Sequence, residues 1–159
     1  VPKSSLHEIA RQEDDGIWRK AQVDVSAMMI GQAQAATDMI VEYAKERETF
    51  GRKIGAYQAV RHPCADMASR VELSTCQLFY AATALKENQG DAPVQIDAAY
   101  LVAQRAALEN AETNIQLHGG IGVTEELSAH VYLKRAHLLN RLFGQSKSAI
   151  TSLLDAESV

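Results

Sequence analysis

Apolar and polar residues alternate with helical spacing along most of the chain. In the stretch from residue 17 to residue 48, Val25, Met29, Ala33 and Ala36 follow one another at intervals of three or four residues. Positions at these intervals share one face of an α-helix. The pattern therefore predicts a first long helix over residues 17–48.

A second stretch, over residues 57–88, keeps the same alternation without a slip. Val60, Cys64, Met67 and Val71 are separated by four, three and four residues. A seam of this kind favours packing against a neighbouring helix at a shallow angle. The sequence therefore predicts a second long helix over residues 57–88.

The third stretch, over residues 93–118, is apolar on nearly all sides between Ile96 and Leu108. A helix without a polar face belongs in the middle of a bundle, where neighbouring helices cover it. We therefore expect a third helix over residues 93–118. Because such a helix needs cover on every side, we also expect a dimer or larger assembly through these helices.

The last part of the chain restarts after a group of glycines. Thr124 is followed by Glu125 and Glu126. This order is typical of a helix start, because a small capping residue precedes acids that stabilise the positive end of the helix. We expect a short helix over residues 124–129 and a fourth long helix over residues 130–155, with Gly144 as a candidate interruption.

Together these elements predict an all-α protein, an up-down four-helix bundle over residues 17–159. Residues 1–16 are polar, and we interpret them as a linker or a remnant of a preceding domain. No run long enough for a strand alternates with a period of two. The residues expected in the core are Val60, Met67, Val71, Leu78, Leu101, Leu108 and Leu139.

Composition narrows the class of protein. Apolar residues make up 47% of the 159 residues and charged residues 23%, which is typical of a globular domain. The net charge of −4 and the scattered Lys and Arg residues argue against a nucleic-acid binder. No apolar run reaches the length of about 18 residues that a transmembrane segment needs. None of the five histidines has the spacing of a metal site, so no metal is expected.

The two cysteines indicate a cellular compartment. Cys64 and Cys76 fall on one predicted helix, about 18 Å apart along its axis, which is too far for a disulfide. The first residues also show no signal-peptide pattern. These observations favour a reducing environment, and we expect a cytoplasmic protein.

Gly119, Gly120 and Gly122 follow the third predicted helix. A dinucleotide-binding glycine loop should follow a strand, so the spacing favours a helix end with a tight turn. The alternative stays open, because Gln116 lies just before the glycines and bare backbone N–H groups can meet a pyrophosphate.

Arg47, Arg52 and Lys53 gather where the first helix is expected to end. Cations at that end stabilise the helix dipole. The same groups can bind phosphates. These residues alone indicate a helical bundle with a candidate anion site at its loops.

Two segments carry a more specific signal. Residues 43–58, Y-A-K-E-R-E-T-F-G-R-K-I-G-A-Y-Q, resemble the Y-x-x-x-R-x-x-F-G-x-x-I/L-x-x-x-Q signature of acyl-CoA dehydrogenases. Residues 116–122, Q-L-H-G-G-I-G, resemble the Q-x-x-G-G-x-G turn of the same family, and residues 65–68 match its usual L-A-D-M segment. Order and separations agree over residues 17–155, which resemble the family's C-terminal helical domain.

The resemblance implies a role in binding FAD across a subunit interface. It implies that Arg47 contacts the FAD pyrophosphate of a neighbouring subunit. Thr49 and Phe50 match positions that line the flavin site, and Gln58 matches a residue near the adenosine portion.

The glycine turn matches a second contact with the pyrophosphate. Gln116 and Gly120 occupy the matching positions, with Gly119 beside them. A bare glycine lets the backbone approach a diphosphate closely. The resemblance therefore favours a phosphate-binding turn over a helix end with a tight turn.

The chain departs from the family where the catalytic base is expected. Phe143 occupies the position of the glutamate in the family's E-G-T motif, and Gln145 that of the threonine. Some members place the base on the first helix of this domain, at a position that aligns with Ala21. Neither residue can accept a proton, so we expect no catalytic residue in this chain.

Residues beside Ala21 offer only weak substitutes. Asp24 is the nearest acid, but it lies about one turn away along the helix, and its side chain is one carbon shorter than that of glutamate. An arginine that often lies near the substrate thioester is replaced by Gln22, although Arg19 is close.

The resemblance implies an FAD-dependent acyl-CoA dehydrogenase of lipid metabolism. Such an enzyme removes an α-proton from an acyl-CoA and passes a hydride from Cβ to flavin N5, giving a trans-2-enoyl-CoA. The partners it implies are further copies or related subunits and an electron-transfer flavoprotein. Two alternatives remain: a non-catalytic subunit of a heteromeric acyl-CoA dehydrogenase, and a flavin-free helical interaction module.

Overall fold

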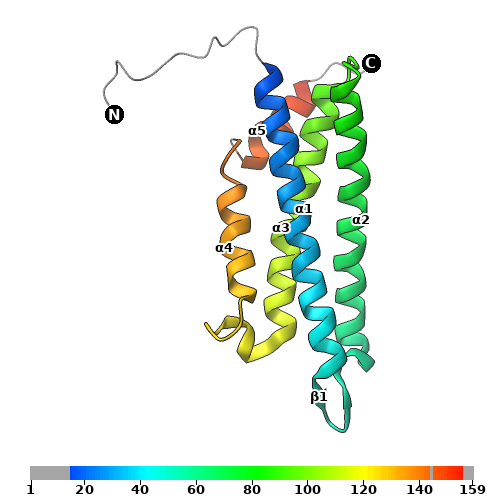
Figure 1. The fold of residues 1–159 in the computed structure, drawn as a ribbon, viewed down its shortest axis with the longest axis vertical. Coiled ribbons are helices and arrows are strands. Elements are labelled where there is room, and N and C mark those ends of the chain that lie inside the picture. The colour runs from blue at the N-terminus through cyan, green and yellow to red at the C-terminus, as the bar shows by residue number, and fades with distance from the viewer. Residues whose placement is uncertain (1–14, 144, 156–159) are drawn as a thin grey trace, which may run out of the picture.

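The computed structural model describes residues 15–143 and 145–155, which form a bundle of α-helices with a small hairpin at one end (Figure 1). The prediction of an all-α bundle is confirmed. The helices are α1 (Asp15–Glu46), α2 (Gln58–Lys86), α3 (Ala92–His118), α4 (Ala129–Leu139) and α5 (Gln145–Asp155). The hairpin strands are β1 (Glu48–Thr49) and β2 (Arg52–Lys53), and short 3-10 turns, η2 (Ile54–Ala56) and η3 (Gly119–Val123), follow the hairpin and α3.

The third helix occupies the centre of the bundle. It packs against α1, α2, α4 and α5. Many of its inner positions are small, since Ala99, Ala103, Ala106 and Ala107 are all buried. Small residues let neighbouring helices approach closely. The cover that its apolar sequence requires therefore comes from the same chain, so this feature alone does not call for a partner.

The predicted fourth helix over residues 130–155 is wrong as a single helix. The chain leaves α4 after Leu139 and begins α5 at Gln145. Arg141 and Leu142 donate their backbone N–H groups only three residues back, to Leu138 and Leu139, at 3.2 and 3.1 Å. Bonds of this span form a tight turn rather than an α-helix. Gly144, the expected interruption, lies outside the described residues.

The predicted short helix over residues 124–129 is also wrong. Residues 119–123 form η3, and residues 124–128 form turns. The Thr124 hydroxyl donates back to the carbonyl of Ile121 at 2.9 Å. The hydroxyl therefore closes the preceding turn instead of capping a following helix.

The expected core was partly correct. Met67, Val71 and Leu139 are buried. The rest of the expected core is only half-buried, namely Val60, Leu78, Leu101 and Leu108. Alanines and the large side chains of Met29, Ile40 and Tyr100 fill the centre instead.

Neither a membrane span nor a metal cluster emerges from the described part of the chain. Among these residues, no helix combines the length and apolarity that crossing a membrane requires. No group of three or more His, Cys, Asp or Glu side chains among them could hold a metal ion. Cys64 and Cys76 both lie on α2 and are free thiols.

Candidate functional site

A hairpin projects from the end of α1 and holds the first signature segment. Glu48 pairs with Lys53 and Thr49 with Arg52 in antiparallel register. The backbone N–H of Ile54 donates to the Arg47 carbonyl at 2.8 Å and closes the base of the hairpin. The strands have two residues each, too short to leave a periodic pattern in the sequence.

The tip of the hairpin exposes a phenylalanine in an unusual conformation. Phe50 and Gly51 have φ angles of 50° and 79°. Positive φ at both central residues suits a two-residue hairpin turn, but a bulky aromatic residue rarely adopts it. The Phe50 side chain is also 97% exposed. An apolar ring held in solvent on a strained turn indicates a contact surface rather than a packing role.

The three cations near the hairpin differ in the contacts that their side chains already make. The Lys53 ammonium pairs with the Glu48 carboxylate at 2.8 Å and donates to the carbonyl of Glu46 at 3.0 Å. The hydrogen bond and charge of Lys53 lower the pKa of Glu48. The Arg52 guanidinium lies 3.9 Å from the centre of the Tyr57 ring. Arg47 is exposed and has no side-chain partner among the described residues.

Tyr57 fixes the hairpin against the start of α2. Its hydroxyl donates to the carbonyl of Thr49 at 3.0 Å. Gln58 follows as the first residue of α2 and is exposed. The predicted positions Thr49, Phe50 and Gln58 therefore belong to one connected unit.

The glycine turn at the end of α3 contains two kinds of glycine, one required by packing and one not. A Cβ on Gly122 would lie 2.4 Å from the carbonyl oxygen of Ile115, so packing requires a glycine there. A Cβ on Gly120 would meet no atom within 4 Å, and the residue is exposed. Gly119 adopts a φ of 66°, and Gln116 is exposed. The packing of this chain does not explain Gly120, which leaves room for a ligand.

A ring contact brings these two segments to the same end of the bundle. The Tyr43 ring of α1 lies 4.4 Å from the His118 ring of α3, measured between ring centres. The buried His118 is held by Nδ1, 2.7 Å from the carbonyl oxygen of Asn114. Figure 1 shows the hairpin and the α3–α4 connection together at that end. The candidate anion-binding residues therefore lie at the same end of the bundle.

Phe143 lies just before α5, which packs against α3 at the end of the bundle away from the hairpin (Figure 1). Its ring packs edge-on against Trp18 at 4.7 Å and against Tyr100 at 5.7 Å, measured between ring centres. Tyr100 is fully buried, and burial raises the pKa of its hydroxyl. The position that the resemblance assigns to a glutamate is thus part of an aromatic cluster.

A buried carboxylate lies beside this cluster. Asp97 of α3 accepts hydrogen bonds from Arg19 at 2.9 Å, from Gln22 at 2.8 Å and from Ser152 at 2.6 Å. Arg19 and Asp97 form an ion pair whose side chains are 19% and 5% exposed. These four residues join α1, α3 and α5, and we call them the Asp97 network.

Sequence reasoning missed Asp97 and Ser152. A signal was present for Asp97, because it is the only acid between Ile96 and Leu108 in a mostly apolar stretch. A charged residue in such a stretch is rarely buried without a partner. No comparable signal marks Ser152, which needs the fold to bring α5 onto α3.

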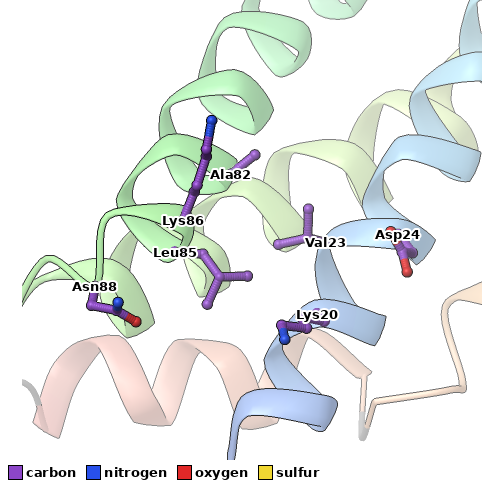
Figure 2. A pocket seen from close by; sticks show the side chains of 7 residues that line it. All are labelled: Lys20, Val23, Asp24, Ala82, Leu85, Lys86 and Asn88. Carbon is purple, nitrogen blue, oxygen red and sulfur yellow. The ribbon is translucent and has the colours of Figure 1, made fainter.

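Asp24 lines a groove between α1 and α2, apart from the aromatic cluster. Figure 2 shows Val23 and Leu85 facing each other across this groove, with Lys20, Asp24 and Asn88 around it. Asp24 is exposed. The residues that line the cavity beside Phe143 do not include Asp24.

Comparison with known families settles the relationship. Residues 20–156 match the family described as acyl-CoA dehydrogenase, C-terminal domain. The chain belongs to the acyl-CoA dehydrogenase family.

Several acyl-CoA dehydrogenases resemble the chain closely. It is 40% identical over 126 residues to acyl-CoA dehydrogenase FadE34 of Mycobacterium tuberculosis, covering 77% of this chain and 17% of that protein. It is also 40% identical over 126 residues to acyl-CoA dehydrogenase IpdE2 of the same organism, covering 78% and 37%. The chain therefore spans well under half the length of these relatives.

Solved structures of other proteins share the fold. The butyryl-CoA dehydrogenase from Megasphaera elsdenii superposes with a TM-score of 0.81 at 25% identity, covering 85% of this chain and 35% of that one. The ChsE4-ChsE5 complex from Mycobacterium tuberculosis gives a TM-score of 0.80 at 26% identity, covering 89% and 40%. Both likenesses extend over most of the five helices.

Proposed function

We propose that this domain supplies one half of an FAD site and acts within an acyl-CoA dehydrogenase that desaturates an acyl-CoA thioester. FAD bound there would supply the hydride acceptor for the reaction. Arg47 would pair with the pyrophosphate, while Gln116 and the backbone at Gly120 would approach the same group. Phe50 and Thr49 would line the cofactor, and Gln58 would lie near its adenosine portion.

The observation that carries this proposal is the unpartnered Arg47 at the same end of the bundle as the open Gly120. A guanidinium without an internal partner can bind a diphosphate without losing an ion pair. The free space at Gly120 lets a phosphate approach the backbone. The residues present therefore fit the phosphate part of the cofactor.

Arg47→Ala is expected to weaken FAD binding by the complete protein about tenfold or more, because it removes a charge-assisted hydrogen bond. Flavin content after purification and the dissociation constant for FAD measure the effect. Arg135→Ala is the matched control, because Arg135 is exposed on α4 and lies in none of the predicted sites. Unchanged flavin affinity in Arg47→Ala would remove Arg47 from the cofactor site.

Phe143 favours a second candidate, a non-catalytic subunit that completes the flavin site of an associated chain. General-base catalysis needs a proton acceptor within hydrogen-bond reach of the substrate carbon. Phe143 and Ala21 have no such group, and Phe143 is held between Trp18 and Tyr100. In either case the base would come from another part of the assembly.

Asp24→Asn is expected to leave the reaction intact, because Asp24 lines the α1–α2 groove rather than the cavity beside Phe143. The assay is anaerobic bleaching of the flavin by acyl-CoA in the complete assembly. Flavin content serves as the control for a merely structural effect. Loss of bleaching at full flavin content would identify Asp24 as the base and contradict this assignment.

A further inference from the structure

The last residue of α3 is a histidine whose ring is held in one orientation. His118 is 5% exposed, and its Nδ1 lies 2.7 Å from the carbonyl oxygen of Asn114, one turn earlier in the same helix. Because a carbonyl oxygen can only accept a hydrogen bond, Nδ1 carries the proton. An apolar side chain would fill the same buried space without losing hydration. The apolar core alone therefore does not explain a histidine at this position.

Tyr43 of α1 packs against the His118 ring. The two ring centres lie 4.4 Å apart, and the ring planes are inclined by 34°. Tyr43 is half-buried, and among the described residues its hydroxyl has no hydrogen-bond partner. The ring of Tyr43, and not its hydroxyl, therefore makes the contact between α1 and the end of α3.

These two rings link the two parts of the proposed phosphate site. On α1, Arg47 follows Tyr43 by one turn, and its backbone N–H donates to the Tyr43 carbonyl at 2.9 Å. On α3, Gly119 follows His118 directly and leaves the helix with a φ of 66°. A shift of one ring against the other therefore changes the separation between Arg47 and the glycine turn.

The glycine turn depends on α3 for its position relative to α1. A Cβ on Gly122 would lie 3.1 Å from the Cβ of His118, so the turn folds back closely onto the helix end. The turn η3 packs against α3 and α4, and no extensive contact joins it to α1 among the described residues. Because His118 is the last residue of α3, its contact with Tyr43 is the one nearest to the turn.

We propose that Tyr43 and His118 are positioning residues of the FAD site, which keep the Arg47 guanidinium and the backbone at Gly120 at the separation that one diphosphate spans. This inference rests on the proposed function, which supplies the diphosphate. Without the ring contact, the end of α1 and the glycine turn take up other relative positions. FAD then binds tightly only to the fraction of molecules in which both parts are in place, so its apparent affinity falls by that fraction.

The test is a titration of the complete, flavin-depleted protein with FAD. Tyr43→Leu removes one ring, and FAD binding is expected to weaken by about two- to tenfold, the range that an aromatic pair contributes to an equilibrium. Tyr43→Phe keeps the ring and is expected to bind FAD as the wild type does. Unchanged affinity in Tyr43→Leu, or an equal loss in Tyr43→Phe, overturns the inference. If Tyr43→Leu does not fold, His118→Leu removes the other ring and has the same expected result.

Two further variants distinguish positioning from a general loss of stability. Arg47→Ala has already lost one of the two phosphate contacts, so adding Tyr43→Leu to it is expected to change FAD affinity by about onefold. A full additional loss overturns the inference. Ser152→Ala removes a hydrogen bond from the Asp97 network and is expected to leave FAD affinity unchanged. An equal loss in Ser152→Ala would assign the effect to stability and overturn the inference.

The single variants also distinguish this inference from the proposed function. If Arg47→Ala weakens FAD binding and Tyr43→Leu does not, the inference is wrong and the proposed function stands. If Arg47→Ala itself binds FAD as tightly as the wild type, Arg47 leaves the cofactor site and the inference falls with it.

Discussion

Gly122→Ala is expected to destabilise the complete protein by about 3 kcal/mol, at the upper end of the range for overpacking. The added Cβ would lie 2.4 Å from the carbonyl oxygen of Ile115 and 3.1 Å from Cβ of His118. One of these contacts is with backbone, so the turn itself must move. Denaturant unfolding followed by the helical circular dichroism signal measures the change.

Gly120→Ala is the matched control, two residues away in the same turn. A Cβ there meets nothing within 4 Å, so the free energy of unfolding should change by less than about 1 kcal/mol. FAD affinity should fall instead, because the new methyl group occupies the space proposed for the pyrophosphate. The account would be contradicted if Gly122→Ala proved as stable as wild type, or if Gly120→Ala bound FAD as tightly.

Asp97→Leu is expected to cost about 3–5 kcal/mol, the range for removing one partner of a buried ion pair. The change leaves the half-buried Arg19 without a counter-charge and removes an acceptor from Gln22 and Ser152. Because the network joins three helices, α5 should also lose protection from proteolysis. The free energy of unfolding and limited proteolysis near α5 measure both effects.

The double variant Arg19→Met, Asp97→Leu distinguishes the effect of an unpaired charge from the effect of altered packing. Replacing both partners with apolar residues removes the unpaired charge, so much of the lost stability should return. Ser152→Ala removes a single hydrogen bond and should cost about 1 kcal/mol. A double variant as unstable as Asp97→Leu would show that charge pairing is not the reason for the loss.

Sequence patterns predicted the long elements of the fold better than the short ones. The spacing of Val25, Met29 and Ala33 predicted α1 to within two residues at each end, since a long helix repeats its signal many times. The sequence indicated an interruption at Gly144, but the end of α4 at Leu139 was missed, because the leucines around it keep helical spacing. The hairpin left no periodic signal, since each strand has two residues.

The candidate FAD site and the Asp97 network differ in how far the sequence could predict them. Arg47, Gln116 and Gly120 were found by motif, and the structure places them at one end of the bundle. The spacing alone favoured a helix end with a tight turn at Gly119, and the phosphate contact was indicated by the family motif. The Asp97 network was out of reach, because it depends on α5 packing onto α3, and the sequence pattern did not show that contact.

The central claim is that this domain contributes Arg47 to an FAD site. The most direct measurement is a structure of the complete protein with FAD bound, and the decisive quantity is the distance from the Arg47 guanidinium to the nearest phosphate oxygen of the cofactor. We predict a charge-assisted hydrogen bond of about 2.7–2.9 Å, to an FAD held mainly by a neighbouring subunit. An FAD bound elsewhere, with Arg47 exposed to solvent, would contradict the account.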